Sequence, residues 1–173
     1  ILQLEPAPST IVKSGRDMID RQLTRLVDDL LDVGRLTTGK ITLQTEQLDY
    51  AAMAATCVEA VRPLMDARHH KLTVDMPLRA VWVEADAIRM TQVLQNLLIN
   101  AAKFTPEGGD IALTVWMDGA HLYTTVVDTG VGMASDSIGG IFTLFSQVEG
   151  AAAGQSGLGI GLTLAKSLVE LHG

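Results

Sequence analysis

The stretch QVLQNLLINAAKFTPEGG, residues 92–109, has the spacing of a buried helix but carries polar residues in its middle. Its apolar residues recur at helical intervals and can pack into a core: Val93, Leu94, Leu97, Leu98, Ala101 and Ala102. Asparagine is a weak helix former that usually sits at caps and turns, so Asn96 and Asn100 need another explanation. Asp86 can cap this helix, and Thr105-Pro106 with Gly108-Gly109 is expected to end it.

The polar residues of this helix share one side of it. At about 100° per residue, Asn96, Asn100 and Lys103 fall on a single narrow stripe. An amide oxygen is a ligand suited to Mg²⁺, which keeps waters and binds substrate phosphates. A lysine one turn further on can meet a phosphate as a point charge. The alternative interpretation is a solvated polar edge on an amphipathic helix.

A second helix is predicted from about residue 14 to residue 37, and Gly39 is expected to end it. Its apolar residues are spaced alternately by four and three positions, which is typical of a coiled-coil seam: Ile19, Leu23, Leu26, Leu30 and Val33. Val27 and Leu31 widen the stripe toward that of a bundle helix. The helix either lies on the rest of the domain or packs against helices outside this chain.

The remaining sequence mixes strands and helices. Strands are predicted at KITLQTEQL (40–48), KLTVDM (71–76) and AVWVEA (80–85), with a hairpin at 110–128 that turns at Asp118-Gly119. Helices are predicted at 50–68 and at about 159–171. This order predicts an α+β fold, a two-layer sandwich with helices on one face of a largely antiparallel sheet.

The segment VVDTGVGM, residues 126–133, ends a predicted strand in a polar turn. The carboxylate of Asp128 can accept a hydrogen bond from an exocyclic amine such as that of adenine. Gly130 and Gly132 let the backbone approach a flat ring and adopt a positive φ. An ordinary Asp-Gly turn after a strand is the alternative.

The segment SGLGIGL, residues 156–162, opens the last predicted helix. Gly157, Gly159 and Gly161 clear side chains from a helix N-terminus, where free amides and the helix dipole suit a polyphosphate. The spacing is neither G-x-G-x-x-G nor that of a P-loop, because no lysine follows.

Composition excludes several classes of protein. The 173 residues are 47% hydrophobic, enough to bury a core, and the net charge of −7 argues against nucleic-acid binding. Cys57 is the single cysteine, so no disulfide can form within the chain and a reducing, cytoplasmic setting is expected. No apolar run approaches the roughly 18 residues of a membrane span, so no direct membrane contact is expected from this piece, although a larger parent could be anchored.

Taken in order, the three motifs resemble the ATP-binding domain of sensor histidine kinases, in the GHKL ATPase superfamily with the Bergerat fold. The resemblance covers nearly the whole chain. RQLTRLVDDLLDVGRLTTGKITL (21–43) is similar to the second dimerisation helix running into the first strand, and IFTLFSQ (141–147) to the phenylalanine box. The resemblance implies a partial dimerisation helix and lead-in at 1–38 and a catalytic domain at 39–173.

The resemblance assigns roles to individual residues. On the phosphate side, Asn100 would hold Mg²⁺, Asn96 would sit beside the γ-phosphate and the metal, and Lys103 would contact phosphate. A second group would line the rest of the nucleotide: Phe104 flanking it, Asp128 reading the adenine amine, Gly130 and Gly132 shaping that wall, and Gly157, Gly159 and Gly161 on the phosphate side. Phe142 and Phe145 would anchor a lid at about residues 133–156.

The implied activity is transfer of the ATP γ-phosphoryl to a histidine, with a response-regulator receiver domain as partner and a homodimer formed through the residue 14–37 helix. The family's acceptor histidine is followed by an acidic residue, and none of this chain's histidines is: His69, His70, His121 and His172. We therefore expect no autophosphorylation of this chain. His69 and His70 lie between a predicted helix and a predicted strand, and we expect both at the surface. The family's last two strands are expected to be missing.

Two alternatives stay open at this point. Another GHKL ATPase, such as a gyrase-like or mismatch-repair protein, would usually place a water-activating Glu four residues before the metal asparagine. Asn96 occupies that position, which favours phosphoryl transfer. The other alternative is a non-enzymatic dimeric interaction module with a vestigial nucleotide pocket, and the intact motifs argue against it.

Overall fold

The computed structural model describes residues 27, 28, 30–146 and 158–173, and the chain divides into two compact units, Ile1–Ile41 and Thr42–Gly173. In the first unit residues 30–37 are helical. Gly39 follows with a φ of +63°, and the Lys40 amide donates to the Arg35 carbonyl at 2.8 Å, so the predicted helix end is confirmed. The seam residues Ile19, Leu23 and Leu26 lie outside the described residues. No helix in the described part is long and apolar enough to cross a membrane.

The second unit contains two sheets in its described residues. Strands β1 (Glu46–Asp49) and β3 (Trp82–Ala85) pair antiparallel. In the other sheet β4 (Asp110–Asp118) pairs in parallel with β2 (Lys71–Asp75) and antiparallel with β5 (His121–Asp128). Most pairings are antiparallel, as predicted, and the parallel β2–β4 pairing is the exception.

Strand β1 is shorter than predicted because residues 40–45 are not part of a sheet. There the Gln44 amide donates to the Asp86 carboxylate at 2.9 Å instead of to a neighbouring strand. The hairpin at 110–128 forms as predicted, but its loop begins one residue after the predicted Asp118-Gly119 turn. Because Asp118 is paired with His121, the two loop residues are Gly119 and Ala120, and Gly119 takes the positive φ, +59°, that the tight loop requires.

The helices of the second unit are α2 (Tyr50–Ala67), α3 (Ala87–Phe104), α4 (Ser135–Ile138) and α5 (Gly161–His172). Asp86 caps α3 as predicted, accepting from the Ile88 and Arg89 amides at 3.1 Å, and Thr105 ends it. Burial alone would raise the pKa of the Asp86 carboxyl. The hydrogen bonds from Gln44, Arg89 and Ile88, with the Arg89 charge, outweigh burial and lower that pKa.

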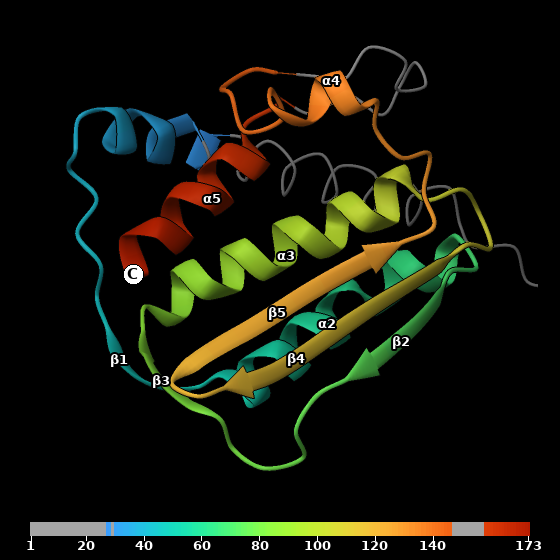
Figure 1. Cartoon of the computed structure of the whole chain (residues 1–173), viewed down its shortest axis with the longest axis horizontal. Coiled ribbons are helices and arrows are strands. Elements are labelled where there is room, and N and C mark those ends of the chain that lie inside the picture. The colour runs from blue at the N-terminus through green and yellow to red at the C-terminus, as the bar shows by residue number, and fades with distance from the viewer. Residues whose placement is uncertain (1–26, 29, 147–157) are drawn as a thin grey trace, which may run out of the picture. The chain divides into compact units, whose positions relative to one another are not determined.

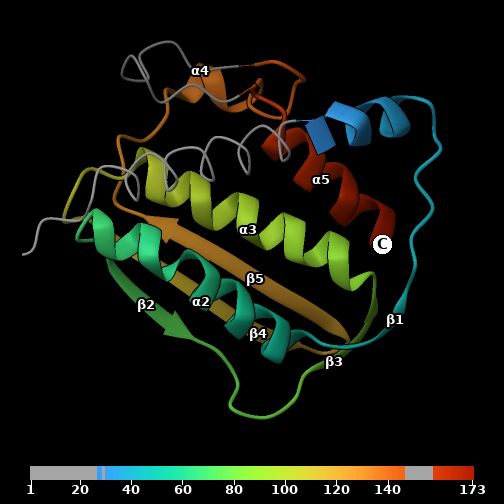
Figure 2. The same cartoon turned by 180° about the vertical axis from the view of Figure 1, so that it is seen from behind.

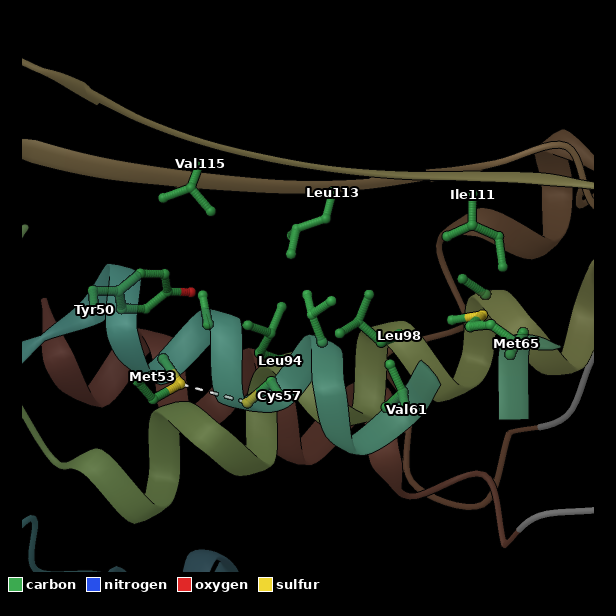
Figure 3. Close-up of a cluster of buried hydrophobic side chains, with 14 residues drawn as sticks. Tyr50, Met53, Cys57, Val61, Met65, Leu94, Leu98, Ile111, Leu113 and Val115 are labelled. Atoms are coloured by element: carbon green, nitrogen blue, oxygen red, sulfur yellow. Dashed lines mark hydrogen bonds between the residues drawn. The ribbon is translucent and has the colours of Figure 1, made fainter. Parts of the chain in front are cut away.

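Helices α2 and α3 cover one face of the three-stranded sheet. Figure 1 shows the sheet in front of α2, and the reverse view in Figure 2 shows α2 in front of the sheet. Alternate residues of β4 point inward, and in Figure 3 Ile111, Leu113 and Val115 reach toward side chains of both helices. Leu94 and Leu98 of α3 are buried in this core, as the helix pattern predicts. The packing of the core therefore determines which side of α3 can face a ligand.

One side-chain prediction is wrong. His69 is exposed, with its Nδ1 2.9 Å from the Glu107 carboxylate, but His70 is buried with 6% of its surface exposed. Its Nε2 lies 3.2 Å from the Thr105 carbonyl oxygen and 3.1 Å from that of Pro106. Carbonyl oxygens can only accept, so Nε2 carries a proton there. The ring holds the turn after α3 against the start of β2.

Candidate functional site

The asparagine stripe of α3 lies where α5 begins. Asn96 is buried, and its side-chain Nδ2 donates to the Gly161 carbonyl at 3.4 Å. A Cβ added to Gly161 would meet the Asn96 amide at 3.6 Å, an ordinary van der Waals contact. Asn100, one turn further along the same stripe, is half-buried. The first turn of α5 is therefore placed beside the side chains predicted to bind metal and phosphate.

Lys103 is a half-buried cation at the end of this stripe. Desolvation lowers the pKa of its ammonium group, and no carboxylate pairs with it among the described residues. Its Nζ lies 4.7 Å from the centroid of the Phe104 ring. A partly desolvated ammonium group without a counter-ion is stabilised by any anion that comes beside it.

The loop after β5 is attached to the end of α3. Asp128 is exposed, and its Oδ1 accepts from the Gly130 amide at 2.8 Å. The Val131 amide donates to the Phe104 carbonyl at 3.2 Å. A Cβ at Gly130 would lie 2.7 Å from that same carbonyl oxygen, so only glycine fits this approach. Residues predicted to contact the base and the phosphates thus meet at one end of α3.

Glycines also allow the close contacts before α5. Gly159 has a φ of +67°, and a Cβ there would lie 2.4 Å from the Ser146 carbonyl oxygen. Among the residues that the structure describes, no side chain caps the first turn of α5, so its amides can donate to a ligand. Gly132 also has a φ of +67°, but no atom of the described residues lies within 4 Å of a Cβ added there. Gly157 lies outside the described residues.

Part of the predicted lid is described. Residues 133–146 contain α4 and the two phenylalanines, and residues 147–156 lie outside the described part of the chain. The Lys166 ammonium of α5 lies 5.3 Å from the centroid of the Phe142 ring. Phe145 is 60% exposed and has a φ of +63°, unusual for a residue with a Cβ. Phe142 thus contacts the helix that follows the lid.

The side chains at this site suit a metal ion that is coordinated mainly by bound phosphates and water and only weakly by the protein. Within the described residues no group of three or more His, Cys, Asp or Glu side chains could hold a metal ion. The stripe offers amide oxygens only, and Mg²⁺ needs few protein ligands where phosphates and waters supply the rest. The donor set therefore suits Mg²⁺ carried by a nucleotide.

Sequence reasoning missed Arg68, which ends α2 and donates from Nη1 to the Ala102 and Lys103 carbonyls. It also missed His172, whose Nε2 accepts from the Asp86 amide at 3.1 Å. Both connect helix ends that are more than 30 residues apart, so no local pattern marks them.

Comparison with known proteins identifies the family. The family described as histidine kinase-, DNA gyrase B-, and HSP90-like ATPases matches residues 85–173, which include α3, the loop after β5 and α5. The chain therefore belongs to this ATPase family.

Relatives narrow the class within the family. The chain is 34% identical over 154 residues to the circadian input-output histidine kinase CikA of Synechococcus elongatus, covering 87% of this chain and 20% of that protein. It is 28% identical over 155 residues to the sensor histidine kinase WalK of Bacillus subtilis, covering 88% of this chain and 25% of that protein. The chain is thus the ATP-binding catalytic domain of a sensor histidine kinase and spans a fifth to a quarter of these relatives.

Solved structures agree with this class. Full-length ShkA in complex with AMPPNP matches with a TM-score of 0.73 and 30% identity, over 98% of this chain and 35% of that one. The histidine kinase AdeS of Acinetobacter baumannii matches with a TM-score of 0.71 over 96% of this chain and 75% of that one. Its 21% identity supports the fold alone. The predicted sandwich fold is confirmed.

Proposed function

We propose that this chain binds ATP with Mg²⁺ and, in the whole protein, presents the γ-phosphoryl group to a histidine in another segment. The observation that carries the proposal is Lys103, a half-buried cation without a carboxylate partner in the described residues, beside the loop that bears Asp128. A polyphosphate would supply the missing counter-ion, and an adenine amine would suit the exposed carboxylate.

Asn100 is proposed as the protein's ligand to Mg²⁺. Its amide oxygen is neutral and hard, which matches the preference of that ion, and it lies one turn from Lys103 on α3. Bound Mg²⁺ would neutralise phosphate charge, and phosphoryl transfer depends mainly on such neutralisation and on positioning.

Asp128 is proposed to read the adenine amine. One carboxylate oxygen already accepts from Gly130, and that hydrogen bond fixes the orientation of the carboxylate. The other oxygen has no partner within the described residues and can accept from a ligand. Guanine presents a carbonyl oxygen at the corresponding position, which a carboxylate would repel.

Transfer is favoured over hydrolysis by the chemistry of Asn96. Its amide cannot take a proton from water, so it cannot act as a general base. It donates to Gly161 instead and joins α3 to α5. The roles proposed for Phe104, Gly132 and Gly159 as ligand-lining residues follow from their places around the end of α3 and the start of α5.

For the whole protein we propose the partners of a two-component kinase. The phosphorylated histidine would donate to a response-regulator receiver domain. The helix at 14–37 would form a homodimer, which agrees with the 51% and 55% exposure of Leu30 and Leu31. The net charge of −7 does not favour nucleic acid. A cytoplasmic location is proposed because ATP is found there.

Calorimetric titration of the chain with ATP tests the proposal. We expect binding that weakens when EDTA removes Mg²⁺, and that loses this metal dependence in Asn100→Ala. Gln95→Ala is the matched control, because Gln95 lies on α3 about 140° around the helix from Asn100. Asp128→Asn should narrow the preference for ATP over GTP. No ATP binding by the folded chain would refute the proposal.

A further inference from the structure

The carbonyl end of α3 is held by groups from outside the helix. The last carbonyls of a helix have no partner within it. The Thr105 amide closes the final turn on Ala101, which leaves Ala102, Lys103 and Phe104. The Val131 amide donates to Phe104, and the Nη1 of Arg68 donates to both of the others, 3.0 Å from the Lys103 oxygen. All three remaining carbonyls are therefore satisfied.

Arg68 is itself held at its backbone. It ends α2, where its amide donates to the Met65 carbonyl at 3.2 Å. Its own carbonyl accepts from the Gly108 amide, in the turn after α3, at 2.9 Å. The side chain is therefore aimed at α3 from a backbone that is already attached to the same region.

The charge of Arg68 is directed at a helix end and not at a carboxylate. Among the described residues it makes no ion pair. The carbonyl end of a helix carries about half a negative charge, and a cation there offsets it. Lys103 and Phe104 belong to this same last turn. Without Arg68, the negative helix end would face the same region as a polyphosphate bound at Lys103.

The geometry points to Arg68 as a positioning residue for the phosphate side of the nucleotide site. It fixes the turn that carries Lys103 and cancels the negative helix end beside it. This inference rests on the proposed ATP binding. It predicts an effect that depends on ligand charge, because ATP carries phosphates and adenosine does not.

Titrations of the chain with ATP and with adenosine, followed by NMR so that weak binding is measurable, test the inference. In Arg68→Met we expect the dissociation constant for ATP to rise at least about fivefold, while that for adenosine changes less than about twofold. Arg68→Lys, which keeps the charge, should recover part of the ATP affinity. Arg62→Met is the control, because Arg62 is also on α2 and, in the described part of the chain, its guanidinium group donates to Glu59 of the same helix.

The outcomes separate the two proposals. If the wild-type chain binds no ATP, the proposed function fails and this inference fails with it. A second outcome is that the wild type binds ATP while Arg68→Met weakens the binding of ATP and of adenosine equally, or changes neither. In that case the positioning role alone is wrong. A general loss of structure would weaken the binding of both compounds. Should Arg68→Met not fold, Arg68→Gln, which is also neutral, carries the same comparison.

Discussion

Replacing Gly130 with alanine should damage both the fold and the nucleotide site. A Cβ at this position would lie 2.5 Å from the Asp128 Oδ1 and 2.7 Å from the Phe104 carbonyl oxygen. The Asp128 side chain can rotate away, but it then loses the hydrogen bond from the Gly130 amide. The Phe104 oxygen is backbone and can move only if the end of α3 moves.

The expected magnitude follows from these contacts. Moving the Phe104 carbonyl loses the Val131 hydrogen bond, which contributes about 1 kcal/mol. Crowding a packed region costs about 1–3 kcal/mol more, so we expect Gly130→Ala to lower the free energy of unfolding by about 2–4 kcal/mol. A displaced Asp128 would forfeit a charge-assisted hydrogen bond of about 1.5–3 kcal/mol, which weakens ATP binding about ten- to a hundredfold.

Urea unfolding and ATP titration measure the two effects. Gly139→Ala is the matched control, because Gly139 has a φ of −64° and no heavy atom of the described residues lies within 4 Å of the added Cβ. That variant should keep the stability of the wild type to within about 1 kcal/mol. If Gly130→Ala matches Gly139→Ala in stability and in ATP affinity, the proposed contact between the loop and α3 is wrong.

Three further outcomes are expected. Asp86→Ala should lower the free energy of unfolding by about 2 kcal/mol, because it removes the helix cap and the hydrogen bond from Gln44. The folded-state pKa of Asp86 lies below the ordinary 3.8, so this stabilisation is present above pH 3.8 and is lost as the pH falls through the lowered pKa. The stabilities of the wild type and the variant should therefore converge in acid. ATP affinity should fall as pH rises through the pKa of Lys103, which is lowered below the ordinary 10.5. Lys103→Met should lack this fall. If the fall persists in Lys103→Met, the proposed contact of Lys103 with phosphate is wrong. Incubation with γ-labelled ATP should leave no acid-labile, base-stable label, and a label abolished by replacing a single histidine would overturn this.

Local rules determined much of this protein from the sequence. Asp86 caps α3 and Thr105 ends it within the reach of a few residues. The hairpin follows from alternating residues around Gly119, and the helical spacing of α3 separates Leu94 and Leu98 from the polar stripe. These features depend on backbone geometry and on the period of each element, both of which are properties of short segments.

Tertiary structure alone decided how the elements are joined around the site. The parallel pairing of β2 with β4 and the contact of Val131 with Phe104 require chain segments that are distant in sequence. His70 was predicted at the surface, but its ring reaches carbonyls 35 and 36 residues away. In the sequence Arg68 is only a basic residue at the end of a predicted helix. A buried donor or an unpaired helix end must find a partner wherever the fold brings one near, and a local pattern contains no information about that partner.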